Sequence, residues 1–140
     1  MSMNTFLDRL IDLSLDEDLG SAGDVTTSAL VPPAALGRGE LWAKEEMVLS
    51  GLGAFVRTFE KVDPGVRVKL EARDGAKTSE RQRVATLKGP LQSLLIGERT
   101  ALNIVQRCAG MATAAAAAMA LIEGVKGSKL KILDTRKTPP

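Results

Sequence analysis

Histidine is absent from the 140-residue sequence, and cysteine occurs once, as Cys108. Without histidine the chain lacks the commonest general base and the commonest ligand of transition metals. A metal site built from these residues would therefore use oxygen ligands. A single cysteine excludes an intrachain disulfide and a cluster of thiolate ligands. We expect Cys108 to be a small core residue.

A secretion signal and a long apolar segment are also missing. Residues 1–4 lack the basic flank and the apolar stretch of a signal peptide. The longest apolar run, residues 114–122, is about half of the roughly 20 residues that cross a membrane. Hydrophobic residues make up 44% and charged residues 26%, an ordinary globular composition. We predict a cytoplasmic protein that uses neither a membrane nor, at a net charge of +2, a nucleic acid as its partner.

The charges are unevenly distributed along the chain. Residues 1–25 contain six acidic side chains and one basic side chain. Residues 124–140 show the reverse bias, because Asp134 is their only acidic residue. An anionic ligand is therefore expected at this basic end, whose cations are Lys126, Lys129, Lys131, Arg136 and Lys137.

Hydrophobic periodicity predicts an α+β chain. Apolar residues at helical spacing indicate helices over residues 3–16 and 52–61, and Gly20 is the expected C-cap of the first. Alternating patterns indicate strands over 38–49, 66–70 and 84–87, with Leu41 and Ala43 on one face and Trp42 on the other. Pro90 opens a helix that ends near Cys108. A second, alanine-rich helix over 111–125 and a strand over 129–133 are expected to follow.

A polar and cationic segment follows the expected last strand. In barrels of alternating strands and helices, functional groups lie at the carboxyl ends of the strands. Arg136 and Lys137 would form an anion site there, to which Thr135 or Thr138 adds a hydroxyl donor. A solvated basic tail explains the same residues equally well.

Two further segments carry candidate functional groups. On the helix that starts at Pro90, Arg99 and Asn103 are four residues apart and share a face away from the apolar stripe. Glu98 and Asn103 are placed to support polar groups near Arg99, although a charged helix surface accounts for all three. The acidic glycine-rich segment 17–27 is expected to be a loop, and we interpret its carboxylates as helix-end structure rather than as a cation site.

Taken together, three motifs resemble quinolinate phosphoribosyltransferase, also called nicotinate-nucleotide pyrophosphorylase (carboxylating). The motifs are Glu-Asp-Leu-Gly followed by Gly-Asp-Val-Thr-Thr over residues 17–27, Gly-Glu-Arg-Thr-Ala-Leu-Asn over 97–103, and Leu-Asp-Thr-Arg-Lys-Thr over 133–138. They occur in the order of the family and with its approximate spacing, and the resemblance covers essentially the whole chain.

The resemblance implies an N-terminal α/β sandwich domain over residues 1–110 and the first helix and strand of an α/β barrel over 111–140. Such a barrel needs about 200 residues or more, so we expect the barrel portion to be incomplete here. The implied enzyme joins quinolinate to phosphoribosyl pyrophosphate with Mg²⁺, in NAD biosynthesis. It forms nicotinate mononucleotide, carbon dioxide and pyrophosphate.

The resemblance also assigns residues. It implies that Arg99 reaches the active site of a partner subunit in a homodimer, and that Thr135, Arg136 and Lys137 contact quinolinate. It places the Mg²⁺ ligands in a barrel portion beyond this segment. The expected last strand, without neighbouring strands, should expose Leu130, Ile132 and Leu133.

Three hypotheses follow from these motifs. The chain is the N-terminal part of the enzyme, as a fragment or as one half of a split enzyme that needs a barrel-bearing partner. Alternatively, it is a short non-catalytic paralogue that serves as a binding or assembly module for a full-length enzyme. A third hypothesis is a related phosphoribosyltransferase with another substrate, such as nicotinate.

Overall fold

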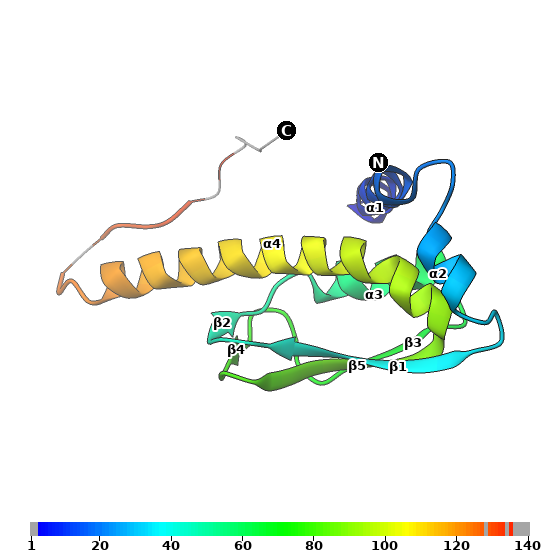
Figure 1. Cartoon of the computed structure of the whole chain (residues 1–140). Coiled ribbons are helices and arrows are strands. Elements are labelled where there is room, and N and C mark those ends of the chain that lie inside the picture. Colours follow the sequence, from blue (N-terminus) through cyan, green and yellow to red (C-terminus); the bar gives the residue numbers. More distant parts are fainter. Residues whose placement is uncertain (1–2, 128, 134, 136–140) are drawn as a thin grey trace.

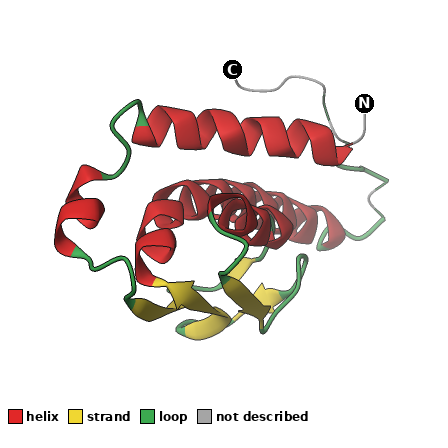
Figure 2. Cartoon of the chain, turned by 90° about the vertical axis from the view of Figure 1, so that its right-hand side faces the viewer, coloured by secondary structure: helices red, strands yellow, loops and turns green. Residues whose placement is uncertain are grey.

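A computed structural model of the chain describes residues 3–127, 129–133 and 135. Its elements form three layers (Figures 1 and 2). A small sheet forms the first layer, helices α3 and α4 cover one of its faces, and helix α1 lies on the far side of these helices. The elements are α1 (Met3–Leu19), α2 (Val25–Leu30), β1 (Leu36–Ala43), β2 (Met47–Val48), α3 (Leu52–Val62), β3 (Arg67–Leu70), β4 (Lys77–Thr78), β5 (Gln82–Pro90) and α4 (Leu91–Glu123).

The main sheet has the strand order β1-β5-β3, and both pairs are antiparallel. Strand β1 alternates as predicted, because Ala43 is buried and Leu41 packs on the core while Trp42 is exposed. The register between β1 and β5 shifts between Leu41 and Trp42, which marks a bulge. The predicted strand 38–49 is interrupted, since β1 ends at Ala43 and residues 47–48 pair with β4 in a separate two-stranded sheet.

The core lies between the main sheet and helices α3 and α4. Phe55 and Phe59 of α3, 2% and 3% exposed, pack edge to face with their ring centroids 5.2 Å apart. Val84 and Ala85 of β5 belong to the same core cluster and are almost fully buried. The apolar face that predicted α3 is therefore the face that covers the sheet.

Helix α4 corrects the prediction of two helices separated near residue 110. It is one continuous helix over Leu91–Glu123, and Gly110 lies inside it on an exposed face. Glycine in a helix interior costs only about 1 kcal/mol relative to alanine, and the helix-forming residues on both sides exceed this cost. The domain boundary at residue 110, which remains a prediction, therefore coincides with no break in the helix.

The two halves of α4 have different surroundings. All of its buried residues lie between Leu94 and Ala109, where the helix covers the sheet. Beyond them, Thr113 still accepts a hydrogen bond from the backbone N–H of Val48 at 2.9 Å. The remaining turns extend past the sheet (Figure 1), and Met111 and Leu121 are 57% and 77% exposed.

Helix α4 is long and apolar enough to cross a membrane. Length and composition alone do not distinguish such a span from a helix that covers a core. The first half of α4 covers the sheet and contributes Leu94, Ala101 and Val105 to the core. The absence of a membrane partner stays a prediction.

Two other expectations about local structure were wrong. The expected loop 17–27 is helical at both ends, because residues 17–19 form the last turn of α1 and residues 25–27 begin the short helix α2. Residues 129–133 form no strand, although Leu130, Ile132 and Leu133 are exposed as expected. Apolar alternation does not make a strand by itself, because a strand is stabilised by the ladder of a neighbouring strand.

Candidate functional site

The candidate site is centred on Arg99, which lies about two turns into α4 on the side that faces α1. Its side chain is 73% exposed. Its Nη1 atom donates a hydrogen bond to Oδ1 of Asp18, at the end of α1, over 2.6 Å. Asp18 is largely buried, with 14% of its side chain exposed. The guanidinium of Arg99 is therefore exposed, while the carboxylate that binds it is largely buried.

The segment that connects α1 to α2 sets the position of this carboxylate. Gly20 and Gly23 adopt positive φ values of 54° and 68°, a conformation that side chains with a Cβ rarely adopt. The N–H of Gly20 bonds to the carbonyl of Asp16 at 2.9 Å, which closes the last turn of α1 and confirms the expected helix-end role of this glycine.

Asp24 is the N-cap of α2, so the helix-end interpretation of the acidic segment is correct at this residue. Its Oδ1 accepts the backbone N–H of Thr27 at 2.8 Å, and its Oδ2 accepts the hydroxyl of the same residue. The hydroxyl bond is the main cause that lowers the pKa of Asp24, and the charge of Arg99 lowers it further. Asp24 thus contributes negative charge near Arg99, while its own oxygens are bonded to Thr27.

The electrostatic surroundings favour the cationic form of Arg99. The hydrogen bond to Asp18 is the largest cause that raises the pKa of its guanidinium, followed by the charge of Asp18. The charges of Asp24 and Glu17 act in the same direction. Arginine is always protonated in proteins. The three neighbouring carboxylates therefore affect the position of the guanidinium and not its charge.

The predicted supporting residues do not bond to Arg99 in the structure. Glu98 instead lines a cavity of about 240 Å³ beneath β1, together with Arg38 and Leu102. Asn103 is exposed one turn after Arg99. The supporting roles of Glu98 and Asn103 therefore stay predictions, and Asp18 is the partner that sequence reasoning missed. The signal was present, because Asp18 and Arg99 belong to two of the three recognised motifs and have opposite charges.

The C-terminal candidates are only partly described. Thr135 is exposed, and Arg136 and Lys137 lie outside the described residues. Lys126, Lys129 and Lys131, which precede them, are exposed as well. Whether these residues meet Arg99 in one substrate site stays a prediction. Cys108 is half-buried and lies against Gly51, in agreement with its expected packing role.

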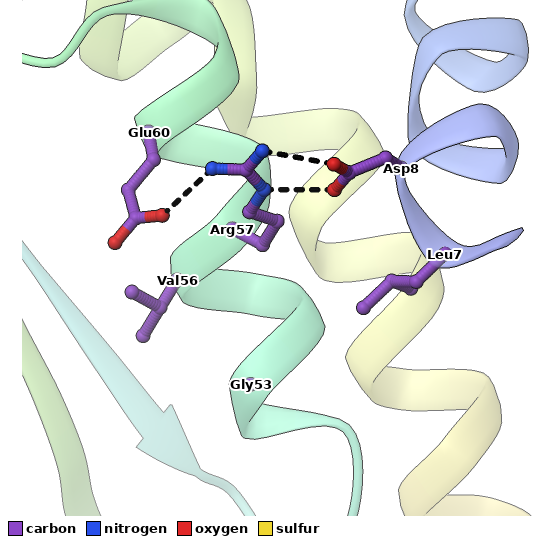
Figure 3. A pocket seen from close by; sticks show the side chains of 6 residues that line it. All are labelled: Leu7, Asp8, Gly53, Val56, Arg57 and Glu60. Atoms are coloured by element: carbon purple, nitrogen blue, oxygen red, sulfur yellow. Dashed lines mark hydrogen bonds and ion pairs between the residues drawn. The ribbon is translucent and has the colours of Figure 1, made fainter. Parts of the chain in front are cut away.

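Arg57 of α3 is bonded to two carboxylates. In a cavity of about 640 Å³ between α1 and α3, Arg57 donates two hydrogen bonds to Asp8, at 2.8 and 2.9 Å, and one to Glu60 at 3.2 Å (Figure 3). Lys61 pairs with Asp12 one turn further along both helices, at 2.8 Å. These contacts attach α1 to α3, so we assign the charged residues around this cavity a structural role.

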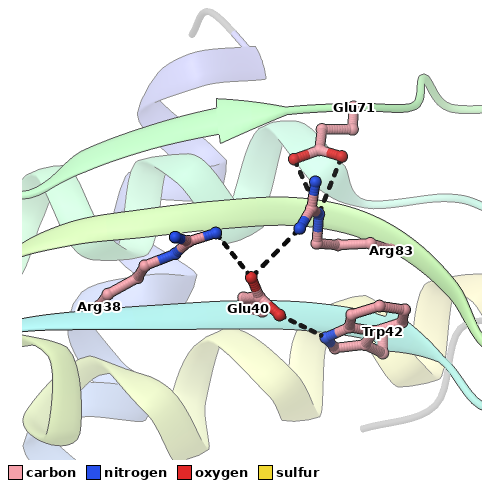
Figure 4. A network of polar contacts seen from close by, with 5 residues as sticks. All are labelled: Arg38, Glu40, Trp42, Glu71 and Arg83. Carbon is pink, nitrogen blue, oxygen red and sulfur yellow. Dashed lines mark hydrogen bonds and ion pairs between the residues drawn. The ribbon is translucent and has the colours of Figure 1, made fainter.

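A second network lies on the sheet face opposite the helices (Figure 4). Glu40 accepts from Arg38 at 2.8 Å, from Arg83 at 3.2 Å and from the indole N–H of Trp42 at 3.0 Å. Arg83 also bonds both oxygens of Glu71 at 3.0 Å. Arg38 and Arg83 are 54% and 37% exposed, against 73% for Arg99, so this face offers less accessible guanidinium groups to an anion than Arg99 does.

The described residues contain no group of three or more His, Cys, Asp or Glu side chains that could hold a metal ion. Asp18, Asp24 and Glu17 are close enough to Arg99 to affect it electrostatically, but two of them are bonded to Arg99 and Thr27. Asp18 and Asp24 are therefore engaged in contacts within the chain, one with Arg99 and one with the start of α2.

Fold and motifs together define the N-terminal sandwich domain of a phosphoribosyltransferase. The sequence model of the family "Quinolinate phosphoribosyl transferase, N-terminal domain" matches residues 24–109. The chain therefore belongs to the quinolinate phosphoribosyltransferase family.

Individual relatives agree with this assignment. A quinolinate phosphoribosyltransferase (decarboxylating) of Nicotiana glauca is 33% identical over 131 residues, which cover 94% of this chain and 36% of the relative. A nicotinate-nucleotide pyrophosphorylase (carboxylating) of Mycobacterium leprae is 36% identical over 129 residues, which cover 91% of this chain and 44% of the relative.

Solved structures show the same relation. The nicotinate-nucleotide pyrophosphorylase of Francisella tularensis superposes with a TM-score of 0.89 at 32% identity, over the whole of this chain and 49% of that chain. NadC of Streptococcus pyogenes gives a TM-score of 0.90 at 32% identity and is covered over 48% of its length. The chain thus spans less than half the length of these relatives.

Proposed function

We propose that this chain supplies the N-terminal part of an enzyme that makes nicotinate mononucleotide from quinolinate and phosphoribosyl pyrophosphate, with release of carbon dioxide and pyrophosphate. The observation that carries the proposal is the exposed guanidinium of Arg99, held in place by Asp18 within the family's own motifs. A guanidinium matches a planar carboxylate with two parallel hydrogen bonds, and quinolinate carries two carboxylates.

The remaining parts of the substrate site belong to the same proposal. Thr135, Arg136 and Lys137 would add a hydroxyl and two cations to the binding of quinolinate, beside the cation of Arg99. These groups bind and orient an anion, and none of them is well suited to transfer a proton near neutral pH. The decarboxylation and the transfer of the phosphoribosyl group would then depend on a barrel portion of the enzyme.

Mg²⁺ is the proposed cofactor of that complete enzyme. The described residues do not fit a magnesium site, since they contain no suitable group of carboxylates, so no step is assigned to the ion here. We further propose a cytoplasmic homodimer, or a pair with a barrel-bearing chain, in which Arg99 serves the active site of the partner. Light scattering on the active enzyme tests this arrangement, and a fully active monomer would refute it.

Complementation tests the proposed function. The chain is combined with the barrel-bearing part of a family member, either fused after Pro140 or as a second chain, to give what we call the completed enzyme. We expect quinolinate-dependent release of pyrophosphate from the completed enzyme and little or none from either part alone. Failure to recover activity with both parts folded would contradict the proposal.

The substitution Arg99→Ala then tests the assigned residue within the completed enzyme. Loss of a charged hydrogen bond should raise the KM for quinolinate by about ten- to a hundredfold. The KM for phosphoribosyl pyrophosphate serves as the internal control and should stay unchanged. An unchanged KM for quinolinate would refute the role of Arg99.

A further inference from the structure

The exposed guanidinium of Arg99 is bonded to the largely buried carboxylate of Asp18. We propose that Asp18 is a positioning residue, which holds the guanidinium of Arg99 in the orientation that receives a carboxylate of the substrate. The inference rests on the proposed function, since it assigns to Asp18 the task of preparing the same quinolinate-binding arginine. The hydrogen bond that carries it joins Nη1 of Arg99 to Oδ1 of Asp18 over 2.6 Å.

The geometry of this contact leaves most of the guanidinium available. A guanidinium has five N–H donors, and only Nη1 donates to Asp18. Arg99 is 73% exposed, whereas Asp18 is 14% exposed. The bond therefore fixes one end of the group while the rest can form two parallel hydrogen bonds to an incoming carboxylate.

Asp18 is distinct from the two other carboxylates that affect Arg99. Both oxygens of Asp24 are bonded to Thr27, where they cap α2. Glu17 is exposed and acts on Arg99 through its charge. Asp18 is the carboxylate whose hydrogen bond to Arg99 the structure records, and it is set at the end of α1 by the turn that begins at Gly20.

Two opposing effects on substrate binding follow from this arrangement. A free arginine loses rotamer freedom when it binds a carboxylate, and the bond to Asp18 has already removed part of that freedom. The negative charge of Asp18 opposes an anionic substrate, but the guanidinium stands between them and exposed charges are screened by water and salt. We therefore expect the ordering effect to prevail, so that removing the carboxylate weakens binding.

Kinetics of the completed enzyme test this inference. Asp18→Asn keeps the size of the side chain and replaces the charged hydrogen bond to Arg99 with a weaker neutral one. It should raise the KM for quinolinate by about three- to tenfold. The kcat and the KM for phosphoribosyl pyrophosphate should stay unchanged, because Asp18 acts before the chemical step and on one substrate. Glu17→Gln is the matched control, since it removes a neighbouring charge without removing a recorded hydrogen bond, and it should leave the KM for quinolinate unchanged.

The double variant Asp18→Asn with Arg99→Ala separates positioning from general damage to the fold. If Asp18 acts through Arg99, Asp18→Asn has no further effect once Arg99 is removed. An equal effect of Asp18→Asn in both backgrounds would overturn the inference, as would a KM that is unchanged or lowered in the single variant. A rise in KM with Glu17→Gln as large as that with Asp18→Asn would also overturn it. If Asp18→Asn does not fold, Asp18→Ser replaces it in the same comparisons.

The outcomes distinguish this inference from the proposed function. If Arg99→Ala raises the KM for quinolinate and Asp18→Asn does not, only the positioning role is refuted. If Arg99→Ala itself has no effect, the substrate-binding role of Arg99 is refuted. The positioning role of Asp18 is then refuted as well, because it acts through Arg99.

Discussion

The close approach of α3 and α4 at Gly97 gives a quantitative test of the fold. Gly97 is buried in α4, and a Cβ at this position would lie 2.9 Å from both Cδ1 and Cε1 of Phe59. Carbon atoms prefer a separation of about 3.5–4.0 Å, so the ring or the helix would have to retreat by roughly 0.6 Å or more. Phe59 is 3% exposed and packs against Phe55, which leaves the ring little room.

The net effect of Gly97→Ala combines two contributions. Overpacking a core costs about 1–3 kcal/mol, and replacing glycine by alanine inside a helix returns about 1 kcal/mol. Because the ring of Phe59 is enclosed, we take the upper part of the overpacking range and expect a net loss of about 1–2 kcal/mol in the free energy of unfolding.

Gly110→Ala is the matched control in the same helix. A Cβ there meets nothing within 4 Å, so only the helix propensity changes. We expect a gain of about 0.5–1 kcal/mol. Urea unfolding followed by far-UV circular dichroism measures both variants against the parent chain. A Gly97→Ala variant as stable as the parent would refute the close packing of α3 on α4, and a destabilised Gly110→Ala variant would refute the continuity of α4.

Three further predictions concern the core, the sheet and the attachment of α1. Phe55→Ala should lower the free energy of unfolding by about 3–5 kcal/mol, because a large buried ring is lost; a loss in urea titrations well below this range would show that Phe55 is not central to the core. Gly89→Ala would place a Cβ 2.9 Å from the Cα of Val66, which is backbone and cannot rotate away, so the melting temperature should fall, and an unchanged value would contradict the close approach of β5 to this segment. The hydrogen bond from Arg57 lowers the pKa of Asp8 below its ordinary value; the stabilisation is therefore present above about pH 4 and is lost as the pH falls through the lowered pKa. We therefore expect melting curves recorded from about pH 7 to about pH 2 to show a smaller acid-induced fall in melting temperature for Asp8→Asn than for the parent. Equal falls would rule out the contribution of the bond between Arg57 and Asp8.

Local sequence determined the individual elements where one face is clearly apolar. Helix α3 was predictable because Leu52, Phe55 and Phe59 recur at helical spacing and all become buried. The faces of β1 were predictable from the alternation around Trp42, and the end of α1 from Gly20. In each case, neighbouring residues contain the physical cause, either a period or a left-handed backbone.

Periodicity was a poor guide where two interpretations use the same residues. Gly110 was compatible with a break or with a helix interior, and packing against the sheet and β2 decided for one continuous α4. Residues 129–133 have the composition of a strand, but a strand needs a neighbour to pair with, and the described part of the chain forms none there. Helix α2 is only six residues long, too short for a periodic signal.

The candidate site shows the same difference between what local sequence predicts and what tertiary packing decides. From its sequence alone, the chain revealed the motifs, the basic and acidic ends, and Arg99 as an exposed cation on a helix. Only the tertiary structure decided which carboxylate holds that cation, because Asp18 is 81 residues away from Arg99 in the chain and is brought to it by the packing of α1 over α4. Spacing along the chain reports contacts within an element, whereas contacts between elements depend on how their buried faces meet.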